Sequence, residues 1–162
     1  MRYLLLYALL LFLSFGCGAN APEASVGFHT AHFYDQTDER NETVIHDLRQ
    51  HLLFVNSAQG CVALHGDEAD ALDRARRFCR SLTFFGYADW RLPTLEEIQS
   101  FSRHMDAEGL VPFFTFPECK RVVGLKSDGT LGAIHTHNAM PKFKETRLKL
   151  PAGIRCVRTD EP

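Results

Sequence analysis

One stretch decides how the rest of this sequence is interpreted: Gly86-Tyr87-Ala88-Asp89-Trp90-Arg91-Leu92-Pro93-Thr94. Its tryptophan is the only one in the chain, and so large an apolar ring predicts a core anchor between two helices. Pro93 has a fixed φ, and Thr94 forms a capping box with Glu97, so a helix begins here. Asp89 and Arg91 share one face of an extended segment, which makes them candidates for an ion pair. The role predicted for the whole set is structural: Asp89, Trp90, Arg91, Leu92, Pro93, Thr94 and Glu97.

Helical periodicity lies on both sides of this stretch. Upstream, apolar residues at three- and four-residue spacing predict a helix over 67–82. Four arginines of that helix are interpreted as a solvated face rather than a nucleic-acid patch: Arg74, Arg76, Arg77 and Arg80. Downstream, Thr94 begins a second helix, and Gly109 ends the region. Four residues form its apolar face: Leu95, Ile98, Phe101 and Met105.

Segments rich in β-forming residues occupy the rest of the chain. Strands are predicted at 43–48, 51–55, 121–126, 130–134 and 154–158, and 142–150 is a candidate for another. Residues 60–64 either extend the first strand pair or lead into the first helix. Ser127-Asp128-Gly129 is a hairpin signal, and Pro151-Ala152-Gly153 is interpreted as a turn. Two helices among these strands predict one small α+β domain.

Three blocks together resemble the Lcl C-terminal domain family, a bacterial family of unknown function. They are Phe78-Cys79-Arg80-Ser81-Leu82, the stretch from Gly86 to Thr94 with Glu96-Glu97-Ile98, and the closing Arg155-Cys156-Val157-Arg158. The resemblance covers roughly residues 43–158. The chain departs from the family at two positions where tryptophan is frequent, since it has Val122-Val123-Gly124-Leu125 and Phe54 there.

The resemblance implies a C-type-lectin-like α+β fold, with two helices packed on a small, twisted, mostly antiparallel sheet. It implies a domain that is used on bacterial surfaces, in one group as an adhesin module for sulfated polysaccharides. It also implies disulfides between Cys79 and Cys156 and between Cys61 and Cys119, although four cysteines allow three connectivities.

The N-terminus has the layout of a secretory signal. Arg2 precedes an apolar run over 3–15, whose 13 residues are fewer than the ~20 that a membrane-spanning helix needs. Ala19-Asn20-Ala21 is one cleavage site, but Pro22 follows it directly. Leu13-Ser14-Phe15-Gly16-Cys17 resembles an imperfect lipobox, which favours lipidation of Cys17. We therefore expect a signal peptide over 1–17, a tether over 18–41 and a domain over 42–160.

Five cysteines are an odd number for an exported protein. Cys17 is either lipidated or removed with the signal peptide. Both outcomes leave four cysteines, which can form two disulfides in an oxidising compartment. The spacing of these four contains no Cys-x-x-Cys, so zinc binding is the weaker interpretation.

Charge and motifs exclude several classes of function. Loss of Arg2 with the signal takes the net charge from −2 to −3, so bulk nucleic-acid binding is not expected. Nucleophile-elbow, phosphate-loop and zinc-protease motifs are absent from the sequence. Arg91-Leu92-Pro93-Thr94-x-x-Glu97 is similar to a segment of formylglycine-generating enzymes, which we interpret as a fold signature only. We expect neither an enzyme nor a cofactor.

Two histidine pairs and one basic strip remain. His29 with His32, and His135 with His137, are candidate metal ligands, but no third ligand is identifiable and exposed histidines are the favoured interpretation. The basic strip is predicted either to contact polyanionic glycans or to protect an edge strand. It contains Lys142, Lys144, Arg147 and Lys149.

The sequence therefore predicts an envelope lipoprotein of bacteria, in the periplasm or outer membrane, whose domain binds a glycan or a protein at the cell surface. The alternative is a structural or assembly subunit that contacts only proteins. Both hypotheses include contact with the membrane through the lipid on Cys17, and neither includes nucleic acid.

Overall fold

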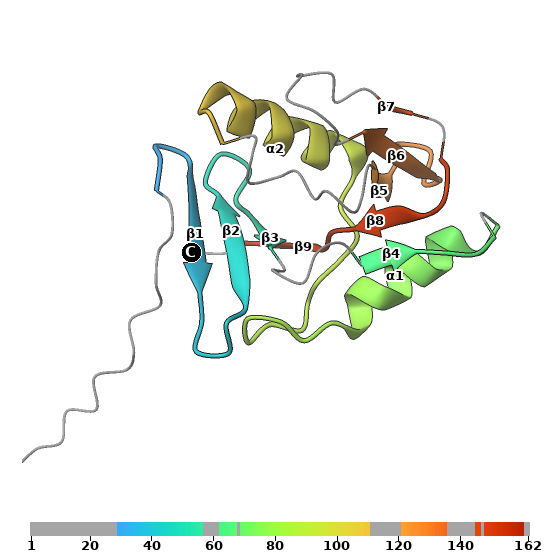
Figure 1. Ribbon diagram of the computed structural model, residues 1–162, viewed down its shortest axis with the longest axis horizontal. Helices are drawn as coiled ribbons and strands as arrows, with labels where there is room; N and C mark the ends of the chain where they lie inside the picture. Colours follow the sequence, from blue (N-terminus) through green and yellow to red (C-terminus); the bar gives the residue numbers. More distant parts are fainter. Residues whose placement is uncertain are drawn as a thin grey trace, which may run out of the picture.

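The structure is a computed structural model that describes residues 29–56, 62–67, 69–110, 121–135, 145–146 and 148–160. It is an α+β protein with two helices and two small sheets (Figure 1). The helices are α1 (Ala71–Ser81) and α2 (Leu95–Ala107). Neither described helix is long and apolar enough to span a bilayer.

The first sheet is antiparallel throughout and has the strand order β1-β2-β3-β9. The bounds of its strands are β1 Phe33–Thr37, β2 Thr43–Asp47, β3 Leu52–Val55 and β9 Val157–Thr159. The second sheet has the order β4-β8-β5-β6-β7 and is mixed, because β5 and β8 run parallel. Its strands are β4 Val62–Leu64, β5 Arg121–Leu125, β6 Leu131–His135, β7 Glu145–Thr146 and β8 Ala152–Ile154.

The predicted mostly antiparallel pairing is confirmed, but the strands form two sheets where one was predicted, and the end of the chain shows why. The predicted strand over 154–158 is divided at Arg155 and Cys156, so that its two halves join different sheets. Ala152 and Gly153 of the predicted turn belong to β8, whereas the predicted strand over 142–150 is represented only by β7 within the described residues. Arg155 is 4% exposed at the division, and its burial lowers the pKa of the guanidinium to about 9.

Strand β1 lies inside the segment predicted to be a tether, and it is part of the folded domain. Phe33 is fully buried, and β1 pairs with β2 along its whole length. The sharp connection between the two strands is held by Asp38 Oδ1, which accepts hydrogen bonds from the Arg40 and Glu42 amides at 2.9 Å each. Because β1 carries mostly polar side chains, its sequence lacks the apolar alternation that predicts a strand, and only its pairing with β2 identifies it as one.

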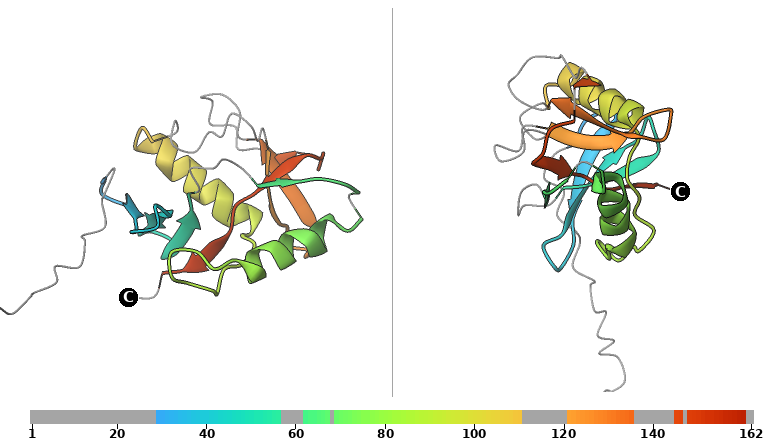
Figure 2. Two further views of the ribbon diagram at one scale, coloured as in Figure 1. Left: turned by 60° about the horizontal axis from the view of Figure 1, so that its bottom comes forward. Right: turned by 90° about the vertical axis from the view of Figure 1, so that its right-hand side faces the viewer.

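The buried side chains form two clusters, one for each helix. Figure 2 shows α1 and α2 on opposite sides of the strands. The apolar face of α2 predicted from the sequence is confirmed: Leu95, Ile98, Phe101 and Met105 are buried in a cluster that contains residues of both sheets. The cluster of α1 contains Ala71, Ala75 and Cys79 together with Trp90 and Cys156.

The predicted start of α2 is confirmed, whereas α1 begins later than predicted. Helix α2 follows Thr94 as predicted. Helix α1 begins at Ala71 rather than at residue 67, because Asp70 is its N-cap. The segment before α1 is held instead by Arg74, whose Nη2 donates to the carbonyl oxygens of His65 and Asp67 at 2.9 and 2.7 Å.

Helix α2 approaches the β5–β6 hairpin closely because two glycines leave room for it. A Cβ atom added at Gly124 would lie 2.8 Å from Ile98 Cδ1 and 3.1 Å from the Leu95 backbone nitrogen. A Cβ atom added at Gly132 would lie 2.5 Å from Leu95 Cδ1. The first turn of α2 therefore rests directly on the backbone of the hairpin.

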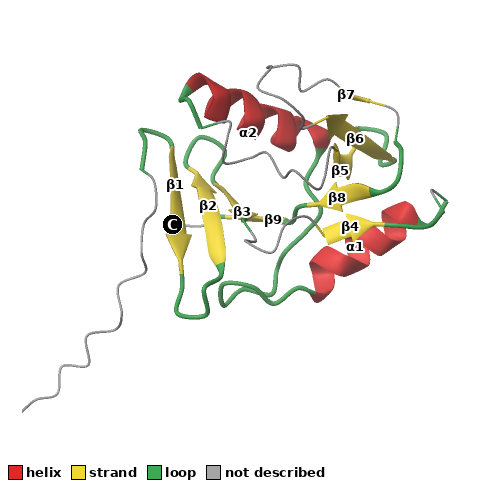
Figure 3. Cartoon of the chain, viewed as in Figure 1, coloured by secondary structure: helices red, strands yellow, loops and turns green. Residues whose placement is uncertain are grey.

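The extended segment from Asp89 to Thr94 joins the two sheets. Arg91 exchanges two backbone hydrogen bonds with Val157 of β9, at 2.8 and 2.9 Å. Two residues later, the Pro93 carbonyl accepts a hydrogen bond of 2.9 Å from the Leu125 amide of β5. Figure 3 shows this linker between α1 and α2 as it passes between the sheets. The segment therefore acts as a short shared strand between them.

Candidate functional site

Trp90 is buried as predicted, with 2% exposure, but its surroundings differ from the prediction. It belongs to the cluster of α1 and does not lie between the helices, because the apolar face of α2 is in the other cluster. The indole N–H is shared between the carbonyl oxygens of Phe84 and Tyr87, each 3.2 Å away. Trp90 therefore fixes the loop that precedes the joining segment.

Asp89 and Arg91, the candidates for an ion pair, take other partners. Asp89 accepts hydrogen bonds of 2.8 and 3.1 Å from Arg158 of β9, and these bonds lower the pKa of the Asp89 carboxyl. The Arg158 guanidinium also lies over the ring of Tyr87, 3.8 Å from its centroid. Arg91 instead donates to both carboxylate oxygens of Glu97, at 2.9 and 2.7 Å. Each side chain thus takes a partner that offers two parallel hydrogen bonds.

The predicted capping box at the start of α2 is confirmed. Thr94 Oγ1 accepts a hydrogen bond of 3.1 Å from the Glu97 amide, and Glu97 Oε2 accepts one of 2.8 Å from the Thr94 amide. Burial by itself raises the pKa of Glu97, but the hydrogen bonds from Arg91 and Thr94 outweigh it, so that the pKa lies below its usual value. Glu97 is therefore an anion that caps the helix and fixes Arg91.

A hollow of about 420 Å³ opens beside this segment, and we call it the arginine hollow. Its lining consists of Arg76, Arg80, Arg91, Leu92, Thr94 and Leu125. Arg76 and Arg80 lie one turn apart on α1, and within the described part of the chain neither guanidinium forms an ion pair with a carboxylate. Because Glu97 offsets the charge of Arg91, the hollow has a net charge of about +2 at neutral pH.

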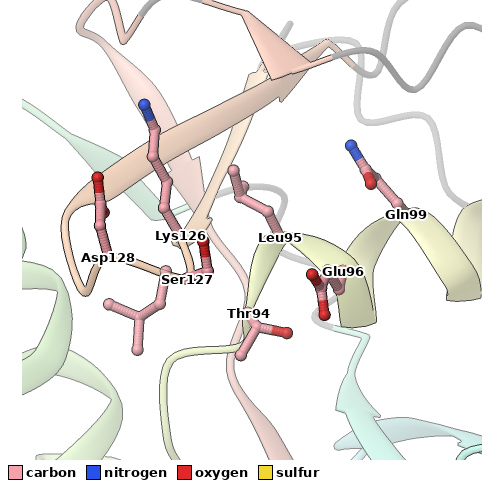
Figure 4. Close-up of a pocket in the computed structure, with 8 residues that line it drawn as sticks. Thr94, Leu95, Glu96, Gln99, Lys126, Ser127 and Asp128 are labelled. Atoms are coloured by element: carbon pink, nitrogen blue, oxygen red, sulfur yellow. The ribbon is translucent and has the colours of Figure 1, made fainter.

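A second hollow, of about 270 Å³, lies on the other side of the Thr94–Leu125 contact, and we call it the hairpin hollow. Figure 4 shows side chains from the first turn of α2 and from the β5–β6 turn around it. Its lining consists of Thr94, Leu95, Glu96, Gln99, Leu125, Lys126, Ser127 and Asp128. Two carboxylates and one ammonium group give it a net charge of about −1. The two hollows share Thr94 and Leu125, so opposite charges meet along one rim.

The disulfide between Cys79 and Cys156 is present, as the resemblance implies, and joins the end of α1 to the connection between β8 and β9. Both cysteines are buried, with 0% and 1% exposure. The bridge fixes α1, and with it Arg76 and Arg80, relative to the joining segment. Cys61 and Cys119 lie outside the described residues, as does Cys17.

The predicted basic strip is described only at Lys149, which is exposed. Lys142, Lys144 and Arg147 lie outside the described residues. A basic surface that the structure does describe is the arginine hollow, and two of its arginines, Arg76 and Arg80, belong to the helix face that the sequence predicted to be solvated. The i, i+4 spacing of two arginines on α1 was the available signal, but its relation to Arg91 depends on tertiary packing.

The histidines considered as candidate metal ligands are not brought together in the part of the chain that the structure describes. His135 ends β6, and His137 lies outside the described residues. His29 stacks on the ring of Tyr34, whereas His32 Nδ1 lies 2.6 Å from a Glu108 carboxylate oxygen. The described residues contain no group of three or more candidate metal ligands.

Comparison with known proteins adds no relative to this description. No protein-family model, no curated protein and no solved structure matches the chain.

Proposed function

We propose that this protein is a non-enzymatic, exported lipoprotein of the bacterial envelope, with a C-type-lectin-like domain that binds an acidic glycan at the cell surface. The glycan contacts the arginine hollow, and the lipid on Cys17 holds the protein at the membrane. The resemblance to the Lcl C-terminal domain family supports both the surface location and the lectin-like topology.

The observation that carries this proposal is the pair of uncompensated guanidinium groups in the arginine hollow. Arg76 and Arg80 stand one turn apart above Leu92 and Leu125, which form an apolar part of the lining. A guanidinium group binds carboxylate or sulfate oxygens through two parallel hydrogen bonds, and apolar side chains contact the C–H faces of a sugar. The hollow thus combines the groups that an acidic sugar requires.

The Cys79–Cys156 disulfide supports export, because such bridges persist in oxidising compartments. Attachment at Cys17 is a separate part of the proposal. Mass spectrometry of the mature protein from its bacterial host should find a diacylglyceryl group on Cys17 as the first residue. An N-terminus at Pro22 without lipid would contradict the anchor and leave the binding proposal standing.

A heparin column at stepped salt concentrations, followed by a glycan array, tests the binding. The Arg76→Ala/Arg80→Ala variant should lose at least about tenfold in affinity, because each charge-assisted hydrogen bond contributes about 1.5–3 kcal/mol. The matched control is Arg77→Ala/Arg103→Ala, which removes the same charge from exposed positions outside the hollow. Equal losses in the two variants would mean that binding follows net charge alone, and would contradict the assignment of the site.

Two outcomes would contradict the assignment of glycan binding to the arginine hollow. If Lys142→Ala/Lys144→Ala abolishes retention and the arginine variant does not, the basic strip is the contact surface. If the wild-type protein binds no glycan on the array, the alternative of a subunit that contacts only proteins is favoured.

A further inference from the structure

The two hollows on either side of the Thr94–Leu125 contact have opposite charge, and this difference bears on the shape of an acidic ligand. The arginine hollow holds two uncompensated positive charges. Across the shared rim, the hairpin hollow presents Glu96 and Asp128. Thr94 precedes Glu96 by two residues, so the change of sign occurs over a short distance.

The size of the arginine hollow fits one acidic group of a ligand. Its volume of about 420 Å³ is at the lower end of the range for small-ligand pockets, about 300–1,000 Å³. Arg76 and Arg80 are four residues apart on α1, about 6 Å along the helix axis, and Arg91 is already engaged by Glu97. The uncompensated positive charges of the hollow therefore come from a single turn of α1.

The surroundings of both carboxylates in the hairpin hollow favour negative charge. Hydrogen bonds from the Thr130 hydroxyl and amide, at 2.6 and 2.8 Å, lower the pKa of Asp128. Glu96 is exposed in the first turn of α2, where the helix dipole favours a negative charge. Lys126 balances only one of the two carboxylates. A second anionic group of a ligand would therefore meet repulsion beyond the rim, within the Debye length of about 8 Å.

On the basis of the proposed function, we infer that the arginine hollow receives a single terminal acidic sugar, and that Glu96 and Asp128 prevent the further acidic groups of a linear polyanion from adding to its affinity. The end group places its carboxylate or sulfate between Arg76 and Arg80. A chain that continues with further acidic groups gains no affinity from its length, because its next acidic group is repelled by the carboxylates of Glu96 and Asp128. The hairpin hollow is thus a selectivity element and not the binding site itself.

Isothermal titration calorimetry with oligosaccharides of alternating glucuronate and N-acetylglucosamine tests this inference. The series should run from two to about sixteen sugars, with one glucuronate at each non-reducing end. For the wild-type protein, we expect molar dissociation constants that agree within about twofold across the series, and a salt dependence that corresponds to about two ion pairs. A neutral oligosaccharide with one terminal sulfate, measured in parallel, separates carboxylate from sulfate preference.

The Glu96→Gln/Asp128→Asn variant should bind the longest chain at least about fivefold more tightly and the disaccharide unchanged, because like-charge repulsion acts only on the longer chains. The substitution to Asn keeps the acceptor that Thr130 uses. The matched control is Glu39→Gln/Asp106→Asn, which removes two negative charges outside both hollows.

Three results would overturn the inference. They are a wild-type affinity that rises steeply with chain length, a Glu96→Gln/Asp128→Asn variant that behaves like its control, and absence of binding to every member of the series. If binding occurs and Arg76→Ala/Arg80→Ala abolishes it at all lengths, the proposed function stands even when the length dependence contradicts the inference. If that variant binds normally, both fail.

Discussion

Removal of the Cys79–Cys156 disulfide should cost this domain much of its stability. The two cysteines are separated by 77 positions, so the bridge closes a long loop of the unfolded chain. The loop-entropy relation then gives a destabilisation of about 4.5 kcal/mol at 25 °C for Cys79→Ala/Cys156→Ala. Single domains have total stabilities of about 5–15 kcal/mol, so the variant should approach the limit of stable folding.

Urea unfolding followed by tryptophan fluorescence provides the assay, because Trp90 is the only tryptophan and lies in the same buried cluster as the bridge. With a slope of about 2 kcal/mol per molar urea, the midpoint should fall by roughly 2 M. A reducing agent should lower the wild-type midpoint to at least the same extent. In the variant, a further shift on reduction would report a second bridge, such as Cys61–Cys119. A midpoint within about 0.5 M of wild type would refute the argument from loop length.

Three further predictions concern the first turn of α2. Thr94→Ala removes the side-chain cap and should lower the free energy of unfolding by about 1 kcal/mol, measured in urea. Gly124→Ala places a methyl group 3.1 Å from the Leu95 backbone nitrogen, and overpacking should lower the thermal midpoint by the equivalent of about 1–3 kcal/mol. The pKa of Glu97 is lowered in the fold, so its contribution to stability is present above the unfolded pKa of about 4.5 and disappears as pH falls through the lower folded value. Urea midpoints measured from pH 6 to 3 should therefore fall less in Glu97→Gln than in wild type; an identical decline would contradict the role of the Arg91–Glu97 pair.

Features that local sequence determines were predictable. The apolar period of α2, the capping box at Thr94 and the turn after Ser127 all depend on residues within four positions of one another, and the structure contains each of them. The disulfide between Cys79 and Cys156 was available only through the family resemblance. Local rules and that resemblance therefore supplied the helices, the hairpin and one cross-link.

Features that depend on distant partners were not predictable. The partner of Asp89 is Arg158, which lies 69 residues away, so the shorter pairing with Arg91 looked equally good from sequence. Strand β1 carries polar residues that conceal its period, and only Phe33 reaches the core. The arginine hollow requires α1 to lie beside the joining segment, and that placement comes from packing around Trp90 and the disulfide.

The joining segment from Asp89 to Thr94 has a consequence for how a ligand would be detected. Its backbone hydrogen bonds to β9 and β5 cannot open separately from the two sheets, so Arg91 and Thr94 are preorganised and lose little freedom on binding. Occupancy of the arginine hollow is then linked to unfolding of the whole domain. A ligand at a hundred times its dissociation constant would add about 2.7 kcal/mol to the stability. A rise in melting temperature should therefore identify ligands from a panel of soluble acidic sugars without any label.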